Sequence, residues 1–340
     1  LVREEKADMV AIGRALFTDP ELPKKAQAGR LSEIRPCNSC EDCVDTIGKG
    51  SGSFCALNPQ SGRENVLQFT TPKSKQHILV IGGGPAGMEA ARAAAEQGHK
   101  VTLCEKSSQL GGRLSLAANM HREQRAFLNY LRAEVQRLPI NIQLNTHVTP
   151  DFVCGQQPDT VIVATGAALA PMAYNISSDA KVIQGSALDQ HLADNTPEKI
   201  TGNTVAVIGS GLLALEMAEW LARAGKTTKL LSSDHRIASE VGRKRRAEEC
   251  RRLDAAGVIL TTGAHIDSIT ADGVHITLDG GQRVVKADSV VIAPSFEPDT
   301  ALADTLDGCG PTIVTIGDCT GFGLLKKAMS DAVKAVHALG

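Results

Sequence analysis

The chain carries one nucleotide-binding pattern twice, and this duplication constrains its fold more than any other feature. In the first copy, an apolar stretch at residues 78–81 leads into Gly82-Gly83-Gly84-Pro85-Ala86-Gly87 and then into an alanine-rich segment ending near Gln97. A shift of 127 residues, from Gly82 to Gly209, aligns this motif with Gly209-Ser210-Gly211-Leu212-Leu213-Ala214. No gap is needed over about 30 residues. A strand, a glycine turn, a helix and another strand in this order predict two Rossmann-like units in an α/β fold.

The first glycine motif has the residues needed to bind a dinucleotide. Gly82 permits a tight turn, Gly84 lets the backbone approach a pyrophosphate, and Gly87 lets the helix pack closely on the strand. The helix N-terminus then offers free N–H groups to the phosphates. Glu105 ends the next strand and can accept hydrogen bonds from ribose hydroxyls.

The second motif lacks the ribose-binding acid. The residue equivalent to Glu105 is Ser232, with His235 and Arg236 close behind it and a basic run at 243–246. Loss of the acid beside cations favours the 2′-phosphate of NADP over NAD. Two alternatives stay open: the basic run forms a solvated helix face, or the second unit is degenerate and binds no nucleotide.

Four of the nine cysteines form a ligand pattern with the spacing C-x2-C-x2-C-x11-C, at Cys37, Cys40, Cys43 and Cys55. Three thiolates in one tight loop and a fourth farther on are typical of a [4Fe–4S] cluster. Zinc, which prefers two separated C-x2-C pairs, and unliganded thiols are the alternatives. We expect buried, inert thiols at the remaining five, Cys104, Cys154, Cys250, Cys309 and Cys319.

Composition excludes several classes of partner. The formal charge of −2 provides no basic field for nucleic acid, and an aromatic content of 3% gives few stacking platforms. No apolar run approaches the ~18 residues of a membrane-spanning helix. The chain starts at Leu1, without a signal peptide, so we expect a fragment that lacks its N-terminal part and resides in the cytoplasm.

The remaining segments predict an ordered series of elements. We expect a short strand at 9–12 followed by Gly13-Arg14, and then a polar helix begun by Asp19-Pro20. Strands are expected at 160–164, 289–293 and 312–314, connectors at 71–76 and 169–202, and a final helix at 324–339. Asp318, after the 312–314 strand, can bond a flavin ribityl hydroxyl, although Gly-Asp is also a common turn.

With these features in order, the chain resembles the C-terminal half of the 2,4-dienoyl-CoA reductase and trimethylamine dehydrogenase group of flavoenzymes, over essentially all its residues. The resemblance implies the end of an old-yellow-enzyme-like (β/α)8 barrel at residues 1–30 and a [4Fe–4S] segment at 31–70. It also implies an FAD-binding domain at 71–168 and 300–340, with an NAD(P)-binding domain at 200–299 inserted into it.

The resemblance also assigns cofactor residues. It implies FMN at Gly13 and Arg14, mostly held by the absent barrel, and the cluster at Cys37, Cys40, Cys43 and Cys55. It implies FAD at Gly82, Gly84, Ala86, Gly87, Glu105, Gly112, Arg113, Thr165, Gly166 and Asp318. NADPH or NADH would bind at Gly209, Gly211, Ala214 and Arg236. No catalytic residue is assigned, because the substrate-handling residues would lie in the barrel.

The implied function is an oxidoreductase that passes electrons between NAD(P)H, FAD, the cluster and FMN to reduce an activated C=C bond of a small-molecule substrate. The Cys40–Cys43 spacing instead resembles amine dehydrogenases, which pass electrons outward to an acceptor protein. An NADPH-to-flavin donor subunit and a non-enzymatic nucleotide-binding module are further alternatives. A disulfide reductase is disfavoured, since no cysteine pair follows the first unit.

Overall fold

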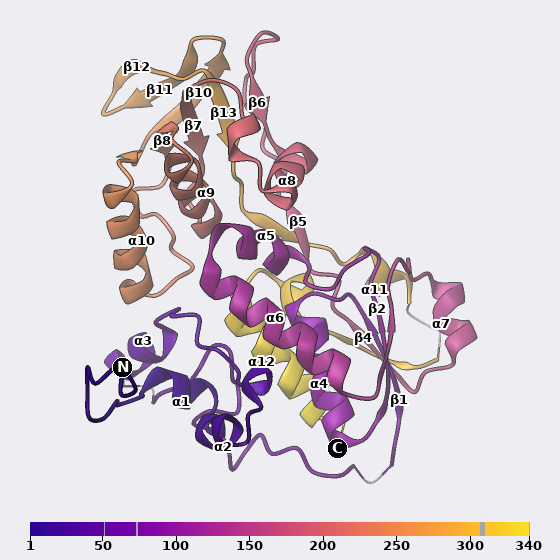
Figure 1. The fold of residues 1–340 in the computed structure, drawn as a ribbon. Coiled ribbons are helices and arrows are strands. Elements are labelled where there is room, and N and C mark those ends of the chain that lie inside the picture. The colour runs from indigo at the N-terminus through magenta and orange to yellow at the C-terminus, as the bar shows by residue number, and fades with distance from the viewer. Residues whose placement is uncertain (51, 73, 307–309, 340) are drawn as a thin grey trace. The chain divides into compact units, whose positions relative to one another are not determined.

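The computed structural model describes residues 1–50, 52–72, 74–306 and 310–339, which form two compact units (Figure 1). Unit 1 comprises Leu1–Leu114, Glu123–Thr165 and Thr300–Gly340. Unit 2 comprises Ser115–Arg122 and Gly166–Asp299. Each unit contains one of the two glycine motifs and one five-stranded parallel sheet.

The sheet of unit 1 has the strand order β15-β4-β1-β2-β3, and all neighbouring strands run parallel. Its strands are β1 (His77–Ile81), β2 (Lys100–Cys104), β3 (Ile140–Gln143), β4 (Thr160–Val163) and β15 (Thr312–Thr315). Every residue of β4 and all but the first of β1 are buried, as expected for central strands covered on both faces. The predicted strands at 78–81, 160–164 and 312–314 are therefore present.

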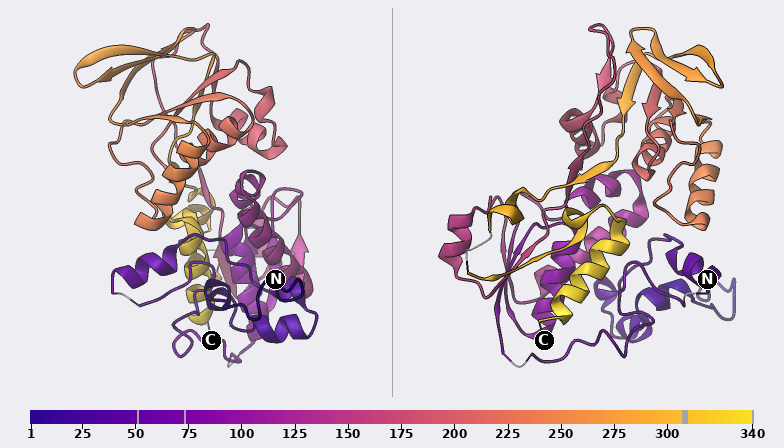
Figure 2. Two further views of the ribbon diagram at one scale, coloured as in Figure 1. Left: turned by 60° about the vertical axis from the view of Figure 1, so that its left-hand side comes forward. Right: turned by 180° about the vertical axis from the view of Figure 1, so that it is seen from behind.

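Helices cover this sheet, and two of them, α4 (Pro85–Gln97) and α12 (Leu324–His337), pack against each other (Figure 2). Pro85 occupies the first turn of α4, where its missing N–H has no helical partner to lose. Gly98 ends the helix in the left-handed region at φ +93°. The other helices of unit 1 are α6 (Arg122–Arg137), α7 (Pro150–Gln156), α11 (Ala301–Thr305) and the 3-10 helix η3 (Gly317–Thr320). Most of α5 (Arg113–Met120) belongs to unit 2.

The N-terminal segment of unit 1 contains short helices but not the strand expected at 9–12. Its elements are α1 (Arg14–Thr18), α2 (Leu22–Gln27), η1 (Leu31–Glu33) and α3 (Asp42–Gly48). Met9 is 86% exposed, and Val10 and Ile12 are also exposed. An apolar run forms a strand only beside another strand, and among the described residues none pairs with 9–12.

The sheet of unit 2 repeats the arrangement of unit 1, with the order β6-β13-β7-β8-β9. Its strands are β6 (Val182–Ile183), β7 (Thr204–Ile208), β8 (Thr227–Leu231), β9 (Ile259–Thr261) and β13 (Ser289–Ile292). Strands β7, β8 and β13 take the places of β1, β2 and β4 in unit 1, so the internal repeat extends to topology. The expected strand at 289–293 corresponds to β13.

Unit 2 also contains elements that the sequence analysis did not identify. An antiparallel sheet forms from β10 (His265–Thr270), β11 (Gly273–Leu278) and β12 (Gly281–Lys286), and a two-stranded one from β5 (Ala167–Leu169) and β14 (Phe296–Pro298). The helical elements are α8 (Gly185–Asp194), η2 (Pro197–Lys199), α9 (Leu212–Arg223) and α10 (Arg243–Ala255). Leu188 and Leu192 of α8 belong to the core, so the segment 169–202 is more than a connector.

The observed architecture confirms the predicted α/β fold class with two Rossmann-like units. Each unit places the carboxyl ends of its parallel strands at one sheet edge, where ligands of such folds bind. Among the described residues, no helix has the length and apolarity needed to span a membrane.

Candidate functional site

The first glycine loop is so tightly packed that two of its glycines cannot be replaced without displacing backbone. Gly82 has φ +107°, and a Cβ there would overlap the carbonyl oxygen of Ala164. A Cβ on Gly87 would overlap the carbonyl oxygen of Gly82. Strand β1 and helix α4 therefore approach more closely than any larger residue allows.

Gly84 lies in a different environment, although it belongs to the same motif. It forms the N-cap of α4, and a Cβ there would meet no atom within 4 Å. No side chain caps this end of the helix. The N-terminus of α4 therefore has neither a side-chain cap nor a close neighbour at Gly84, which suits the approach of an anion.

Glu105, directly after β2, is buried and accepts a hydrogen bond from the backbone of the glycine loop. One carboxylate oxygen accepts a hydrogen bond of 2.6 Å from the N–H of Gly83. The other accepts bonds of 2.8 Å from the N–H and hydroxyl of Ser107. The carboxylate is therefore fixed beside the glycine loop.

Other predicted FAD residues converge on the same sheet edge. The N–H of Gly111 donates to the carbonyl of Gly83 at 2.7 Å, and a Cβ on Gly112 would lie 3.1 Å from Cα of Gly84. The backbone of Thr165 lies beside Gly82. The structure thus brings the 111–113 turn and the end of β4 to the first glycine loop.

Asp318 lies close to this loop as well. A Cβ on Gly317 would be 2.9 Å from Cβ of Ala86, so η3 is adjacent to the first turn of α4. Asp318 accepts a hydrogen bond of 3.1 Å from the N–H of Gly323, and burial raises the pKa of its carboxyl. Lys327 instead bonds Asp331 and the carbonyl of Gly317.

In unit 2, the second glycine loop is packed as closely as the first, but a carboxylate lies at the N-terminus of the helix that follows it. A Cβ on Gly209 would overlap the carbonyl oxygen of Ala293, as at Gly82. The side chain of Glu240 accepts a hydrogen bond of 2.6 Å from the N–H of Leu212, in the first turn of α9, beside Gly211. A carboxylate therefore occupies the position that an anionic ligand of this helix would take. Sequence analysis missed Glu240, because nothing in its spacing marks it.

The residues predicted to select NADP lie at the end of β8 and just beyond it. Ser232 is fully buried, with its hydroxyl 3.0 Å from that of Ser210, and Arg236 is exposed. In the basic run at 243–246, Arg245 is buried against Glu249, and Arg246 bonds the carbonyls of Ala238 and Val241. The run is thus only partly a solvated face, formed by Arg243 and Lys244.

A buried acid lies at the same position of the helix in both repeats, at Glu89 and Glu216. Glu216 contacts Arg245 at 3.5 Å and His121 at 3.6 Å. Glu219, Glu249 and Arg252 complete this buried cluster. Burial, together with Glu249, raises the pKa of Glu216 to about 8.

Glu216→Gln should remove a pH dependence from the stability of unit 2. A carboxyl whose pKa is raised on folding stabilises the protein fully below its unfolded pKa, near 4.5, and this contribution is lost as the pH rises through about 8. Each pKa unit corresponds to about 1.4 kcal/mol. Thermal melts at pH 5 and pH 9 should show a larger drop for the wild type than for Glu216→Gln. Glu198→Gln, at an exposed position, is the control, and equal drops in all three proteins would contradict the assignment.

The four predicted cluster ligands line one small pocket in unit 1, at Cys37, Cys40, Cys43 and Cys55. All four are free thiols. Burial raises the pKa of Cys40 to about 12 and also raises that of Cys43, so positive charge in the pocket is needed to hold them as thiolates. Among the described residues, no three His, Cys, Asp or Glu side chains are close enough to bind a single metal ion as they stand.

Three residues of α1, Arg14, Phe17 and Thr18, border the same pocket. The hydroxyl of Thr18 lies 3.5 Å from the sulfur of Cys55, and Thr18 is 1% exposed. Arg14, predicted to contact FMN, lines the pocket and pairs with Glu41 between the second and third cysteines. Gly13 caps α1 and is exposed.

The other cysteines only partly fit the expectation of buried thiols. Cys104 and Cys319 are buried, but Cys154 is exposed and Cys250 is half-buried. Cys309 lies outside the described residues. Cys154 lies on the short helix α7, and its side chain is exposed there.

Comparison with known proteins identifies the family. Residues 76–338 match the pyridine nucleotide-disulphide oxidoreductase family, whose members bind FAD and NAD(P)H. The chain is 33% identical over 326 residues to bilirubin reductase of Mediterraneibacter gnavus, covering 94% of this chain and 49% of that protein. It is 30% identical over 286 residues to a probable N-methylproline demethylase of Rhizobium meliloti, covering 81% of this chain and 41% of that protein.

A solved structure has the same fold over almost the whole chain. The complex of 2-naphthoyl-CoA reductase with 2-naphthoyl-CoA has a TM-score of 0.88 and 29% identity, covering 98% of this chain and 51% of that one. The chain spans about half the length of the relatives it matches. It belongs to the pyridine nucleotide-disulphide oxidoreductase family, and its relatives fit the 2,4-dienoyl-CoA reductase and trimethylamine dehydrogenase group that its sequence resembles.

Proposed function

We propose that this chain is the electron-transfer part of an iron–sulfur flavoenzyme that uses NAD(P)H to reduce an activated C=C bond of an enoyl or dienoyl compound. The observation that carries the proposal is in unit 1, where one compact body contains both the four-cysteine pocket and the glycine loop of an FAD-type fold. The reductases among its relatives support the direction of electron flow.

In this proposal, FAD occupies the sheet edge of unit 1. The N-terminus of α4 at Gly84 and Ala86 faces the pyrophosphate, and Gly82 and Gly87 keep the loop close to β1. Glu105 accepts hydrogen bonds from the adenosine ribose. The remaining contacts come from Gly112, Arg113, Thr165, Gly166 and Asp318. Residues 71–168 and 300–340 would then form the FAD-binding domain, preceded by the barrel end (1–30) and the cluster segment (31–70).

The cysteine pocket suits a [4Fe–4S] cluster better than a single ion. Each of the four thiolates of such a cluster binds a different iron, so the sulfurs lie farther apart than the ligands of one ion. Four free thiols around one pocket supply this donor set. Gly13 and Arg14 would contribute to an FMN site completed outside this chain.

The second fold, at residues 200–299, would bind the nicotinamide dinucleotide through Gly209, Gly211 and Ala214. Ser232 leaves room for a 2′-phosphate, and the exposed Arg236 can pair with it, which favours NADPH. Glu240 must leave the N-terminus of α9 before a pyrophosphate can bind there. When bound, NAD(P)H would supply a hydride, and the flavins and the cluster would carry its two electrons one at a time.

Glu105→Ala should weaken FAD binding by about 10- to 100-fold, because hydrogen bonds to a buried carboxylate contribute about 1.5–3 kcal/mol. Quenching of flavin fluorescence during titration of the apoprotein measures the dissociation constant. Glu64→Gln, at an exposed carboxylate of the same unit, should bind FAD like the wild type. An unchanged FAD affinity in Glu105→Ala would show that this carboxylate does not contact the ribose.

An anaerobic titration tests the proposed function. The chain, reconstituted with FAD, iron and sulfide, is titrated with NADPH and then with NADH while the flavin absorbance is followed. Rapid bleaching by NADPH supports a reductase whose electrons enter through the second fold. No bleaching by either nucleotide, with flavin and iron present, would overturn the proposal.

That negative result would favour the second candidate, oxidation of a methylated amine with electrons passed outward to an acceptor protein. The probable N-methylproline demethylase among the relatives and the short Cys40–Cys43 spacing support this alternative. Addition of an N-methylated amine to the whole enzyme would then reduce the flavin in place of NADPH.

A further inference from the structure

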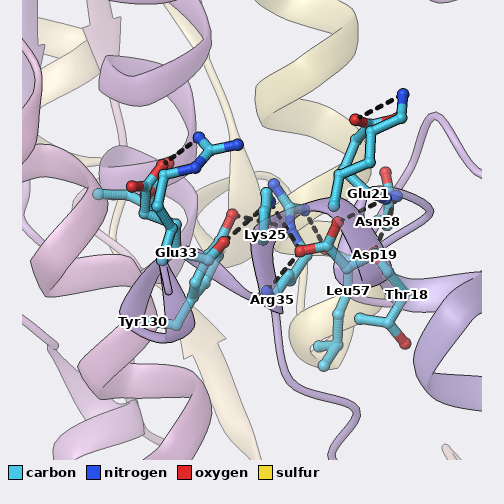
Figure 3. Close-up of polar contacts among 12 residues, drawn as sticks. Thr18, Asp19, Glu21, Lys25, Glu33, Arg35, Leu57, Asn58 and Tyr130 are labelled. Carbon is cyan, nitrogen blue, oxygen red and sulfur yellow. Dashed lines mark hydrogen bonds and ion pairs between the residues drawn. The ribbon is translucent and has the colours of Figure 1, made fainter. Parts of the chain in front are cut away.

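Arg35 is a buried arginine that joins the cysteine segment to the first dinucleotide fold, all within unit 1 (Figure 3). It lies two residues before Cys37 in the sequence. Its guanidinium donates to the carbonyl of Leu57, two residues after Cys55, and to the hydroxyl of Tyr130 on α6 at 3.1 Å. One side chain thus links both ends of the cysteine segment.

The same guanidinium pairs with Glu89 on α4 at 3.3 Å. Glu89 is fully buried and also accepts bonds of 2.8 and 2.9 Å from Arg92. Although burial alone would raise the pKa of Glu89, the two guanidiniums lower it below its usual range. All three groups are therefore charged. Arg92 also pairs with Glu96 at 2.6 Å, so this network of two arginines and two glutamates has no net charge. Arg35 is its member that bonds Leu57 in the lining of the cysteine pocket.

The backbone of Arg35 is fixed as firmly as its side chain. Asp19, at the end of α1, accepts a hydrogen bond of 2.8 Å from the N–H of Arg35 and one of 2.7 Å from the ammonium of Lys25 (Figure 3). Asp19 is 4% exposed. The position of the positive charge relative to the cysteine pocket, which Leu57 itself lines, is therefore defined by several elements.

We propose that Arg35 is a positioning residue for the cluster and that the positive charge of its guanidinium makes the cluster easier to reduce. This inference rests on the proposal that the four cysteines bind a [4Fe–4S] cluster. Reduction adds one electron and breaks no covalent bond, so the fixed guanidinium of Arg35, which bonds Leu57 in the pocket lining, stabilises the reduced form directly.

A series of charge variants tests the electrostatic part. Arg35→Gln removes one positive charge from the network, Glu89→Gln removes one negative charge, and the double variant has the same total charge as the wild type. The reconstituted chain is titrated with dithionite and redox mediators, and the reduced cluster is followed by electron paramagnetic resonance. We expect the midpoint potential to rise in the order Arg35→Gln, wild type, Glu89→Gln, with the double variant close to the wild type.

A conservative variant tests the positioning part. Arg35→Lys retains the charge but cannot bond Leu57, Tyr130 and Glu89 at once. We expect it to retain a potential near that of the wild type but to contain less iron per chain after reconstitution. Arg137→Gln, at a half-exposed arginine of the same unit, is the control and should change neither value.

The outcomes separate this inference from the proposed function. A wild-type chain that binds no iron refutes the cluster itself. Iron bound with equal potentials in wild type, Arg35→Gln and Glu89→Gln overturns the inference alone. If Arg35→Gln does not fold, Glu89→Gln and the double variant still decide, because an unchanged potential in Glu89→Gln also overturns it.

Discussion

Cys40→Ala is expected to reduce the iron content of the reconstituted chain to about a tenth of the wild-type value or less. Cys40 is the most central of the three closely spaced cysteines, and burial raises the pKa of its thiol to about 12. Such a thiol becomes a ligand only when metal charge stabilises its thiolate. Iron and sulfide analysis, with the visible absorbance of the cluster, measures the effect.

The matched control for Cys40→Ala is Cys154→Ala, which removes an exposed thiol on α7 of the same unit. This control should retain the full iron content. Full iron in Cys40→Ala would refute the ligand assignment, whereas stoichiometric zinc with no labile sulfide in the wild type would favour the zinc alternative.

Gly87→Ala is expected to destabilise unit 1 by roughly 3 kcal/mol or more. The added methyl group would overlap the carbonyl oxygen of Gly82, so α4 must move away from β1 and from the core they share. The second repeat has Ala214 at this position. The midpoint of thermal unfolding, followed by circular dichroism without flavin, measures the loss.

Gly84→Ala separates folding from binding at the same loop. Its φ of −72° suits alanine, and a Cβ there meets no protein atom within 4 Å. The variant should therefore fold like the wild type but bind FAD about tenfold or more weakly, since the methyl group occupies the approach of the pyrophosphate. Ala214→Gly should cost only about 1 kcal/mol. Equal stability of Gly87→Ala and Gly84→Ala would contradict this account of the packing.

Local sequence features predicted the parts of the fold that depend on neighbouring residues. The apolar run at 78–81 predicted a buried central strand, which is present as β1. Pro85 and Gly98 marked the start and the end of α4. The 127-residue shift predicted a second unit of the same topology, and the strand orders of the two sheets confirm it. The cysteine spacing predicted one shared site, and the four thiols line one pocket.

Features that depend on distant residues were not predictable in the same way. The run at 9–12 has strand-like composition, but pairing requires a neighbour that its own residues do not provide. Arg35 and Glu89 are 54 residues apart, and neither belongs to a motif. Their one signal was the alignment of Glu89 with Glu216, because a charged residue that recurs on the inner face of both helices must have a buried partner.

The carboxylate of Glu240, bonded to the first turn of α9, would compete with the dinucleotide proposed to bind the second fold. The dinucleotide affinity of the chain equals that of the open form multiplied by the fraction of molecules in which Glu240 has moved away. A pyrophosphate carries more charge than one carboxylate and gains more from the helix terminus, so it can displace Glu240. A singly charged anion, such as chloride, gains less from the exchange. Glu240 would therefore select against singly charged anions at the N-terminus of α9.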